Sequence, residues 1–314
     1  MKTYTYGGDV VFKIQQDTGE LFSMVNRSKS KKDVLIPHIL PDGTEIRTLG
    51  AEFVNSESVF GRIVVDDAIS SVERGAFKHC RADEVVWPKS CPCIPTSCFD
   101  SSVIDILSNI DDVSEVESWG LSFLETKKLR WPSACKLIPW SCFEGSKIES
   151  VTNVNHVESI DNFAFHYTNI KEFTWPDNCD CIPRACFEDS SLSCIKNANH
   201  VKVVHSFAFA NTEIEEFQWF DDCKEIPKSC FLQCSNLKKI SNIEHVTKIG
   251  SSAFGASSKV KIDMTSSLIS TIAPLAFVGV PSKNIKLPYY MDEVDPRWWK
   301  DDDLRETLTR DPDL

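Results

Sequence analysis

The chain has 314 residues, of which 42% are hydrophobic and 25% are charged, a composition that excludes a disordered polymer and indicates a folded protein. Its 34 basic and 46 acidic residues give a net charge of −12. This charge argues against nucleic acid as a partner, because a nucleic-acid-binding protein needs a basic surface that displaces counterions.

Residues 1–32 are expected to form a β cap. Apolar and polar residues alternate over residues 2–25 around Asp17-Thr18-Gly19, a sequence that favours a hairpin turn. The N-terminus shows no apolar signal-peptide region, and no run approaches the roughly 20 apolar residues of a membrane span. We therefore expect a cytoplasmic or particle-associated protein with no membrane partner. A cell-surface location is the alternative if another route exports the chain.

Residues 33–290 contain an internal repeat. Its clearest marks are four tryptophans spaced 44 residues apart, Trp87, Trp131, Trp175 and Trp219. Three further columns keep the same frame: Cys91, Cys135, Cys179 and Cys223; Ile94-Pro95, Ile138-Pro139, Ile182-Pro183 and Ile226-Pro227; and Cys98-Phe99, Cys142-Phe143, Cys186-Phe187 and Cys230-Phe231. Such registration indicates a stack of similar structural units.

Each 44-residue unit is itself a doublet. An aliphatic residue precedes an aromatic residue or leucine by five positions every 22 or 23 residues, as in Ile138/Phe143 and Ile160/Phe165. With a divergent first copy at residues 49–53, this makes about eleven coils. Each coil adds a short strand that ends alternately in Trp or Asn, which predicts a leucine-rich-repeat solenoid with one parallel sheet.

On these residues the chain resembles the BspA-type leucine-rich repeat family. Leu237-Lys-Lys-Ile240 followed by Ile249-Gly-Ser-Ser-Ala253-Phe254 matches the family pattern, and residues 182–187 are a cysteine variant of it. The resemblance covers residues 33–288 and implies an α/β-type repeat solenoid with short strands, turns and short helices. Members of the family are surface adhesins and ligand-recognition solenoids, and related repeats occur in phage and mobile-element proteins.

The 13 cysteines are the least usual count, and eight of them fall in two repeat columns. Equivalent cysteines in successive 44-residue units would lie about 10 Å apart, too far to share one metal or disulfide. We expect them to be small buried hydrophobic residues. Disulfides within a coil, such as Cys91–Cys98, and metal binding are the alternatives. His156, His200 and His245 share one repeat position and are expected to cap turns.

No GxSxG, P-loop, GxGxxG or HExxH motif is present, so we expect no enzyme activity and no cofactor. The informative positions point outward from the predicted strands, where charges of opposite sign neighbour one another. They form either a solvated, self-neutralising face or the binding surface of the solenoid. The candidate binding residues on it are Lys127, Lys128, Arg130, Lys171, Glu172, Glu215, Glu216, Lys238 and Lys239.

Residues 291–314 hold nine acidic and four basic residues. Trp298 and Trp299 suggest a docked turn followed by a short helix, or a tail that becomes ordered on a partner, and both are candidate binding residues. The whole sequence predicts a non-catalytic module that binds a protein, or alternatively a glycan. A structural component of a phage or other particle, held by its tails, is the second hypothesis, and a surface adhesin is the third. The sequence predicts no oligomeric state.

Overall fold

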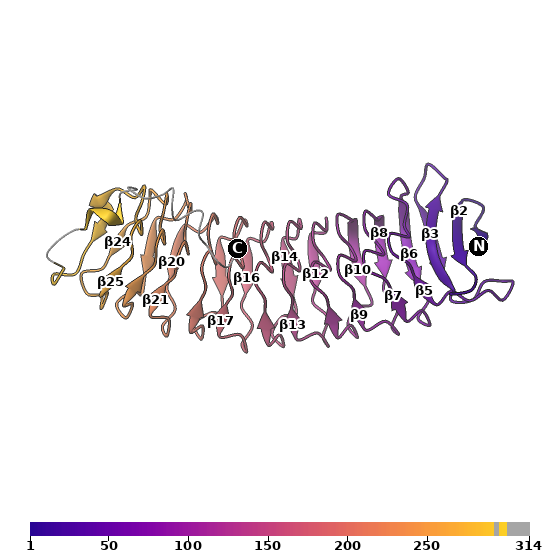
Figure 1. Ribbon diagram of the computed structural model, residues 1–314, viewed down its shortest axis with the longest axis horizontal. Coiled ribbons are helices and arrows are strands. Elements are labelled where there is room, and N and C mark those ends of the chain that lie inside the picture. The colour runs from indigo at the N-terminus through magenta and orange to yellow at the C-terminus, as the bar shows by residue number, and fades with distance from the viewer. Residues whose placement is uncertain (292–294, 300–314) are drawn as a thin grey trace. The chain divides into compact units, whose positions relative to one another are not determined.

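The computed structural model describes residues 1–291 and 295–299. The chain is a β-solenoid of about 11 turns with almost no helix, which confirms the predicted fold class. It divides into two units, Met1–Cys179 and Asp180–Leu314 (Figure 1). None of the helices in the described part of the chain is long and apolar enough to cross a membrane.

The first unit begins with an antiparallel cap made of β1 (Lys2–Tyr6), β2 (Val10–Gln15) and β3 (Glu20–Asn26). The turn between β2 and β3 contains Gly19 at φ 70°, as the predicted hairpin requires. A second hairpin turn, at Gly7 and Gly8, joins β1 to β2 and was not predicted. Strand β3 also pairs in parallel with the first short strand of the solenoid, so the cap continues directly into the repeat.

Two rows of parallel strands follow, because each coil contributes one strand to each row. In the first unit the strands of one row have three to six residues and those of the other row have two. The long-strand row of the first unit contains β4 (Lys32–Ile36), β6 (Phe60–Val65), β8 (Arg81–Val86), β10 (Val103–Ser108), β12 (Lys128–Arg130), β14 (Ser150–Thr152) and β16 (Glu172–Thr174). Its short-strand row contains β5 (Thr48–Leu49), β7 (Ser71–Val72), β9 (Cys93–Ile94), β11 (Glu115–Val116), β13 (Leu137–Ile138) and β15 (Ser159–Ile160). The second row adds to the single sheet expected from the sequence.

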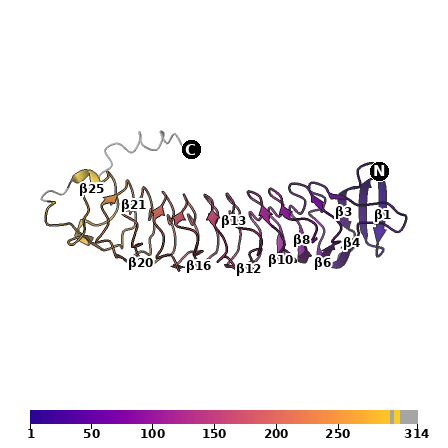
Figure 2. The same ribbon diagram turned by 90° about the horizontal axis from the view of Figure 1, so that it is seen from below.

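The second unit repeats this plan (Figure 2). Its long-strand row contains β18 (Cys194–Lys196), β20 (Glu216–Gln218), β22 (Lys239–Ser241), β24 (Ile262–Asp263) and β26 (Ile285–Lys286). Its short-strand row contains β17 (Cys181–Ile182), β19 (Val203–Val204), β21 (Glu225–Ile226), β23 (Lys248–Ile249) and β25 (Thr271–Ile272). The helices in the described residues are two single-turn 3-10 helices, η1 (Ser282–Asn284) and η2 (Pro296–Trp298).

A turn follows each short strand and forms the third side of the coil. The phenylalanine of the turn is buried and stacks on its equivalent in the next coil, with ring centroids 5.3 Å apart for Phe77 and Phe99 and 5.6 Å for Phe209 and Phe231. The backbone N–H of Phe99 also donates to the Gly120 carbonyl of the next coil at 3.0 Å. Each coil is therefore held to its neighbour by both a ring ladder and a backbone ladder.

The alternation of Trp and Asn has a hydrogen-bonding reason in addition to a packing one. Trp131 is fully buried, and its Nε1–H donates to the Cys135 carbonyl at 3.0 Å. One coil later, Asn153 adopts φ 62° and donates from Nδ2 to the Trp131 carbonyl at 2.8 Å. Asparagine tolerates this left-handed backbone better than most residues. Asn109 and Asn242 make the same hydrogen bond to the tryptophan carbonyl of the preceding coil.

Cysteine and histidine take the structural roles expected of them. All 13 cysteines are free thiols, and both repeat columns are buried. Burial raises the pKa of Cys142 and Cys230 well above the ordinary value, which keeps these thiols protonated and unreactive. His156 Nε2 lies 2.9 Å from the Pro132 carbonyl, and His245 Nε2 lies 2.8 Å from the Phe220 carbonyl. These two histidines therefore cap turns.

Candidate functional site

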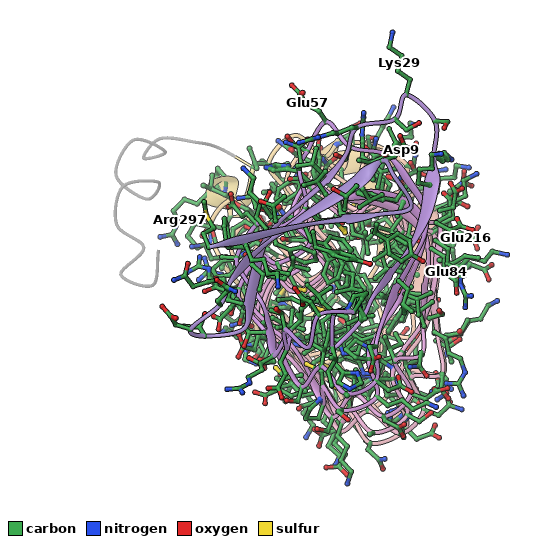
Figure 3. All side chains as sticks on the ribbon, turned by 90° about the vertical axis from the view of Figure 1, so that its right-hand side faces the viewer. Asp9, Lys29, Glu57, Glu84, Glu216 and Arg297 are labelled. Atoms are coloured by element: carbon green, nitrogen blue, oxygen red, sulfur yellow. The ribbon has the colours of Figure 1, made fainter. Side chains whose placement is uncertain are left out.

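The predicted binding residues of the strand face lie on the long-strand row and are exposed. In the first unit Lys127, Lys128 and Arg130 lie on or just before β12, and Lys171 and Glu172 lie at the start of β16. In the second unit Glu215 and Glu216 lie at β20, and Lys238 and Lys239 lie at β22. Charged side chains of this row, such as Glu84, project outward from the ribbon (Figure 3).

Part of this face is self-neutralising, as one of the two readings of the sequence predicts. Lys238 Nζ lies 2.6 Å from Glu215 on the preceding coil, and Lys147 forms the same kind of pair with Glu125. Arg130 pairs with Asp111, 19 residues earlier in the chain, at 2.9 Å. Exposed pairs of this kind contribute about 0–1 kcal/mol each, so they balance charge more than they stabilise the fold.

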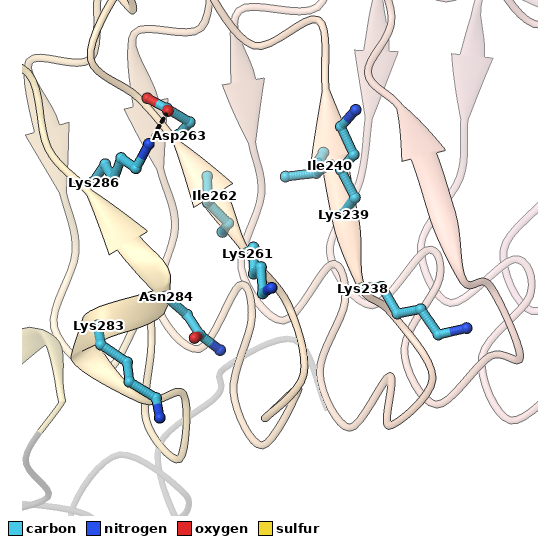
Figure 4. A pocket seen from close by; sticks show the side chains of 9 residues that line it. All are labelled: Lys238, Lys239, Ile240, Lys261, Ile262, Asp263, Lys283, Asn284 and Lys286. Carbon is cyan, nitrogen blue, oxygen red and sulfur yellow. Dashed lines mark hydrogen bonds and ion pairs between the residues drawn. The ribbon is translucent and has the colours of Figure 1, made fainter.

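The pairing is incomplete toward the end of the second unit, where five lysines line one groove. It has a volume of about 750 Å³ and spans β22, β24 and β26. Figure 4 shows that its side chains come from three successive coils. We call it the lysine groove, and its lining residues are Lys238, Lys239, Ile240, Lys261, Ile262, Asp263, Lys283, Asn284 and Lys286.

The register of the strands explains the concentration of charge. Lys239 lies opposite Glu216 on one side and opposite Lys261 on the other, so two lysine residues occupy adjacent positions across the row. Like charges directly opposite each other destabilise a sheet. Within residues 1–291 and 295–299, no ion pair joins Lys239, Lys261 or Lys283 to a carboxylate.

One carboxylate does lie in the groove and is held by its neighbours. The Lys286 ammonium lies 2.8 Å from Asp263, and the Thr265 hydroxyl donates to the same carboxyl group at 2.7 Å. These hydrogen bonds lower the pKa of Asp263 to about 2, and Asp263 in turn raises the pKa of Lys286. Asp263 thus neutralises Lys286, as Glu215 neutralises Lys238, and Lys239, Lys261 and Lys283 are left available to an anion.

Sequence reasoning found part of this groove and missed the rest. Lys238 and Lys239 were candidates, whereas Lys261, Lys283 and Lys286 were not, because the strand pattern was followed only as far as residue 242. The 22- or 23-residue period that leads from Lys239 to Lys261 would have identified the adjacent cation. The candidates at β12 belong to the first unit, and those at β20 and β22 belong to the second.

Trp298 and Trp299 lie elsewhere, at the last coil of the second unit. The Phe277 N–H donates to the Trp298 carbonyl at 2.9 Å, and the Trp299 ring lies 5.4 Å from the Phe277 ring. Trp299 Nε1–H also donates to the Val280 carbonyl at 2.8 Å. Trp299 therefore occupies the next position of the phenylalanine column, 22 residues after Phe277. Apart from Met291 and residues 295–299, the predicted acidic tail lies outside the described residues.

The repeat of this chain matches a known protein family. The model of the BspA type leucine-rich repeat region matches residues 51–167 and 158–286, in six copies. The chain belongs to this family. BspA-type solenoids serve in general as interaction modules and are generally non-catalytic. No curated protein matches the chain.

Three solved bacterial structures are similar to it. A leucine-rich repeat protein from Bacteroides ovatus is 16% identical with a TM-score of 0.48, covering 88% of this chain and 92% of its own. A leucine rich cell surface protein from Faecalibacterium prausnitzii is 14% identical with a TM-score of 0.43, covering 87% and 94%. The pneumococcal vaccine antigen PcpA is 13% identical with a TM-score of 0.47, covering 89% and 80%.

Proposed function

We propose that this protein is a non-catalytic recognition module that binds an acidic segment of a protein partner in the lysine groove. The observation that carries the proposal is the adjacency of Lys239 and Lys261 on neighbouring strands. Because two like charges in register disfavour the unbound sheet, a carboxylate-bearing partner relieves a repulsion and also gains complementary contacts. Repeat solenoids commonly bind along one extended face.

A protein partner suits the groove better than a glycan does. Ile240 and Ile262 between the lysines are buried, so the groove offers a partner chiefly charge, which the carboxylates of an acidic peptide complement. The nine lining residues include no aromatic side chain on which a sugar ring would stack. The cytoplasmic, particle-associated and cell-surface hypotheses stay predictions from the sequence.

The proposal is tested with hexaglutamate as the probe and calorimetry as the readout. The variant Lys239→Glu with Lys261→Glu is expected to lose affinity by about tenfold or more. The matched control, Lys224→Glu with Lys248→Glu, makes the same charge change near the short-strand row of the same unit and is expected to keep the wild-type affinity.

Two results contradict the proposal. If both double variants lose affinity equally, binding depends on net charge and not on the groove. If a sulfated oligosaccharide of matched charge binds the groove more tightly than hexaglutamate does, the partner is a glycan and not a protein.

A further inference from the structure

The first unit carries a second surface that no candidate from the sequence touches. Five aromatic residues gather on the turns of three successive coils, and we call them the aromatic turn surface: Trp119, Phe123, Trp140, Phe163 and Tyr167. Tyr167 is 65% exposed, Phe123 48% and Trp140 39%, while Trp119 and Phe163 are half-buried. Large exposed apolar side chains that lie together commonly mark binding sites.

The fold does not require aromatic residues at these positions. Trp119 and Phe163 occupy a turn position that holds Ser97 and Ser141 in the alternate coils. Phe123 and Tyr167 occupy another, which holds Ser101 and Gly145. A solenoid coil therefore closes equally well with a small residue at either position.

The backbone at these positions makes aromatic residues an unfavourable choice. Trp119, Phe123, Phe163 and Tyr167 all adopt positive φ, between 50° and 60°. A left-handed backbone costs a residue with a Cβ atom about 1–2 kcal/mol, and glycine or asparagine adopts it more easily. The turn conformation therefore does not explain why these four residues are aromatic. A role of their side chains at the surface does.

The rings of neighbouring coils contact one another edge to face. Trp119 and Trp140 meet edge to face, with ring centroids 4.4 Å apart and planes at 69°. Trp140 and Phe163 meet at 6.2 Å and 84°. The Phe123 ring lies against Gly145, where a Cβ atom would be only 2.3 Å from its Cε1. Because Gly145 has no side chain, the Phe123 ring has room to lie there.

The charge around the rings has one sign. The three turns, residues 117–124, 139–146 and 161–168, contain Glu117, Glu144 and Asp161 but no lysine or arginine. Glu117 is fixed by the Thr96 N–H and hydroxyl, which donate to it at 2.8 and 2.6 Å. Glu144 lies 3.6 Å from His166 Nδ1. Aromatic faces and carboxylates both attract cations.

We infer that the aromatic turn surface binds an arginine-bearing basic segment of a protein partner. A guanidinium group is planar, so it can stack on Trp140 or Tyr167 and still direct N–H donors toward the neighbouring carboxylates. A lysine ammonium has no plane to stack and is more strongly hydrated. This site differs from the lysine groove in its residues, its unit of the fold and the charge of its ligand, so it does not depend on the function proposed above.

The test uses the full chain with hexa-arginine and hexalysine peptides, with the affinity of each measured by calorimetry. Hexa-arginine is expected to bind about fivefold more tightly than hexalysine. Trp140→Ala and Tyr167→Ala are each expected to weaken hexa-arginine binding about fivefold. Leu137→Ala is the matched control, and it is expected to bind hexa-arginine as the wild type does. Leu137 lies on the short strand β13, three residues before Trp140, and is also exposed, at 37%.

Three results would overturn the inference. The first is equal affinity for the two peptides, which would indicate attraction to a net negative protein alone. The second is unchanged hexa-arginine binding in Tyr167→Ala, a variant whose exposed side chain can be removed without loss of the fold. The third is tighter binding of a neutral oligosaccharide such as maltohexaose, which would make the surface a glycan site.

Discussion

The lysine groove and the aromatic turn surface are built on the same repeat but use different parts of it. The groove lies on strands, where register places Lys239 beside Lys261 at one strand spacing, about 4.8 Å. The aromatic turn surface lies on turns, where Tyr167 has φ 57° and is 65% exposed. Buried residue columns hold the coils together in both regions. The difference between the two surfaces therefore shows that outward-facing positions can change residue type without changing the fold.

The largest expected effect is on the free energy of unfolding, and it compares the loss of a core tryptophan with the loss of a surface tryptophan. Trp131→Ala removes a fully buried indole and its hydrogen bond to the Cys135 carbonyl, so the free energy of unfolding is expected to fall by about 3–5 kcal/mol. Trp140→Ala, nine residues later, should lower it by about 1 kcal/mol or less. Denaturant unfolding measures both. Similar losses in the two variants would mean that the aromatic turn surface belongs to the core.

A smaller effect tests whether Gly145 positions the Phe123 ring. Gly145→Ala forces a Cβ atom into that ring and also strains a backbone at φ 68°, so we expect a loss of stability of about 2 kcal/mol together with weaker hexa-arginine binding. Gly43→Ala is the control, because Gly43 has φ 83° but no atom within 4 Å of the added Cβ. If both variants bind hexa-arginine as wild type does, the Phe123 ring position is unimportant for the surface.

Salt should distinguish the two surfaces. Raising the salt concentration from about 0.1 M to about 1 M shortens the Debye length from about 10 Å to about 3 Å. Hexaglutamate binding should lose most of its affinity, because the lysine groove offers it chiefly charge. Hexa-arginine binding should decline less, because ring stacking persists in salt. Calorimetric titrations across this range check the prediction, and a steeper decline for hexa-arginine would contradict it.

The smallest effect is the titration of one carboxyl group in each region. Lys286 and Thr265 lower the pKa of Asp263 to about 2. Loss of solvent around the carboxyl raises the pKa of Asp161, although the residue as a whole stays exposed. Carbon-detected NMR titration should therefore find Asp161 protonating first as the pH falls. Asp263 should stay ionised below pH 3. If Asp263 protonates before Asp161, the surroundings described for these two carboxyl groups are wrong.

The sign of the linked stability also differs between the two groups. The folded pKa of Asp263 lies below its unfolded value, so its contribution is present above the unfolded pKa and is lost as the pH falls toward 2. The folded pKa of Asp161 lies above its unfolded value, so ionisation of Asp161 disfavours the folded state as the pH rises through that range.

The sequence predicted the scaffold because the scaffold is periodic. Trp131, Cys135 and Phe143 mark buried columns, and a 22-residue period can be read without any structure. The turns were harder to predict, because their positive φ is accepted by residues as different as Ser141 and Trp119 and leaves no fixed residue type. The aromatic turn surface therefore appeared only when three coils were brought together in space.

A docked turn at Trp298 and Trp299 was one of the two predictions for the end of the chain, but its place in the phenylalanine column was not predicted. Trp299 continues the phenylalanine column at the expected spacing, but the residues before it do not form another strand-and-turn pattern. The lysine groove was found in part, since Lys239 belongs to a recognised strand. Its neighbour Lys261 lies just before a strand of only two residues, Ile262–Asp263.

The most direct test of two separate surfaces is a double comparison of the two peptides on two variants by calorimetry. Lys239→Glu with Lys261→Glu should lose hexaglutamate binding and keep hexa-arginine binding, whereas Trp140→Ala with Tyr167→Ala should do the opposite. If each variant weakens both peptides, or neither weakens its own, the chain does not carry two binding surfaces of opposite charge preference.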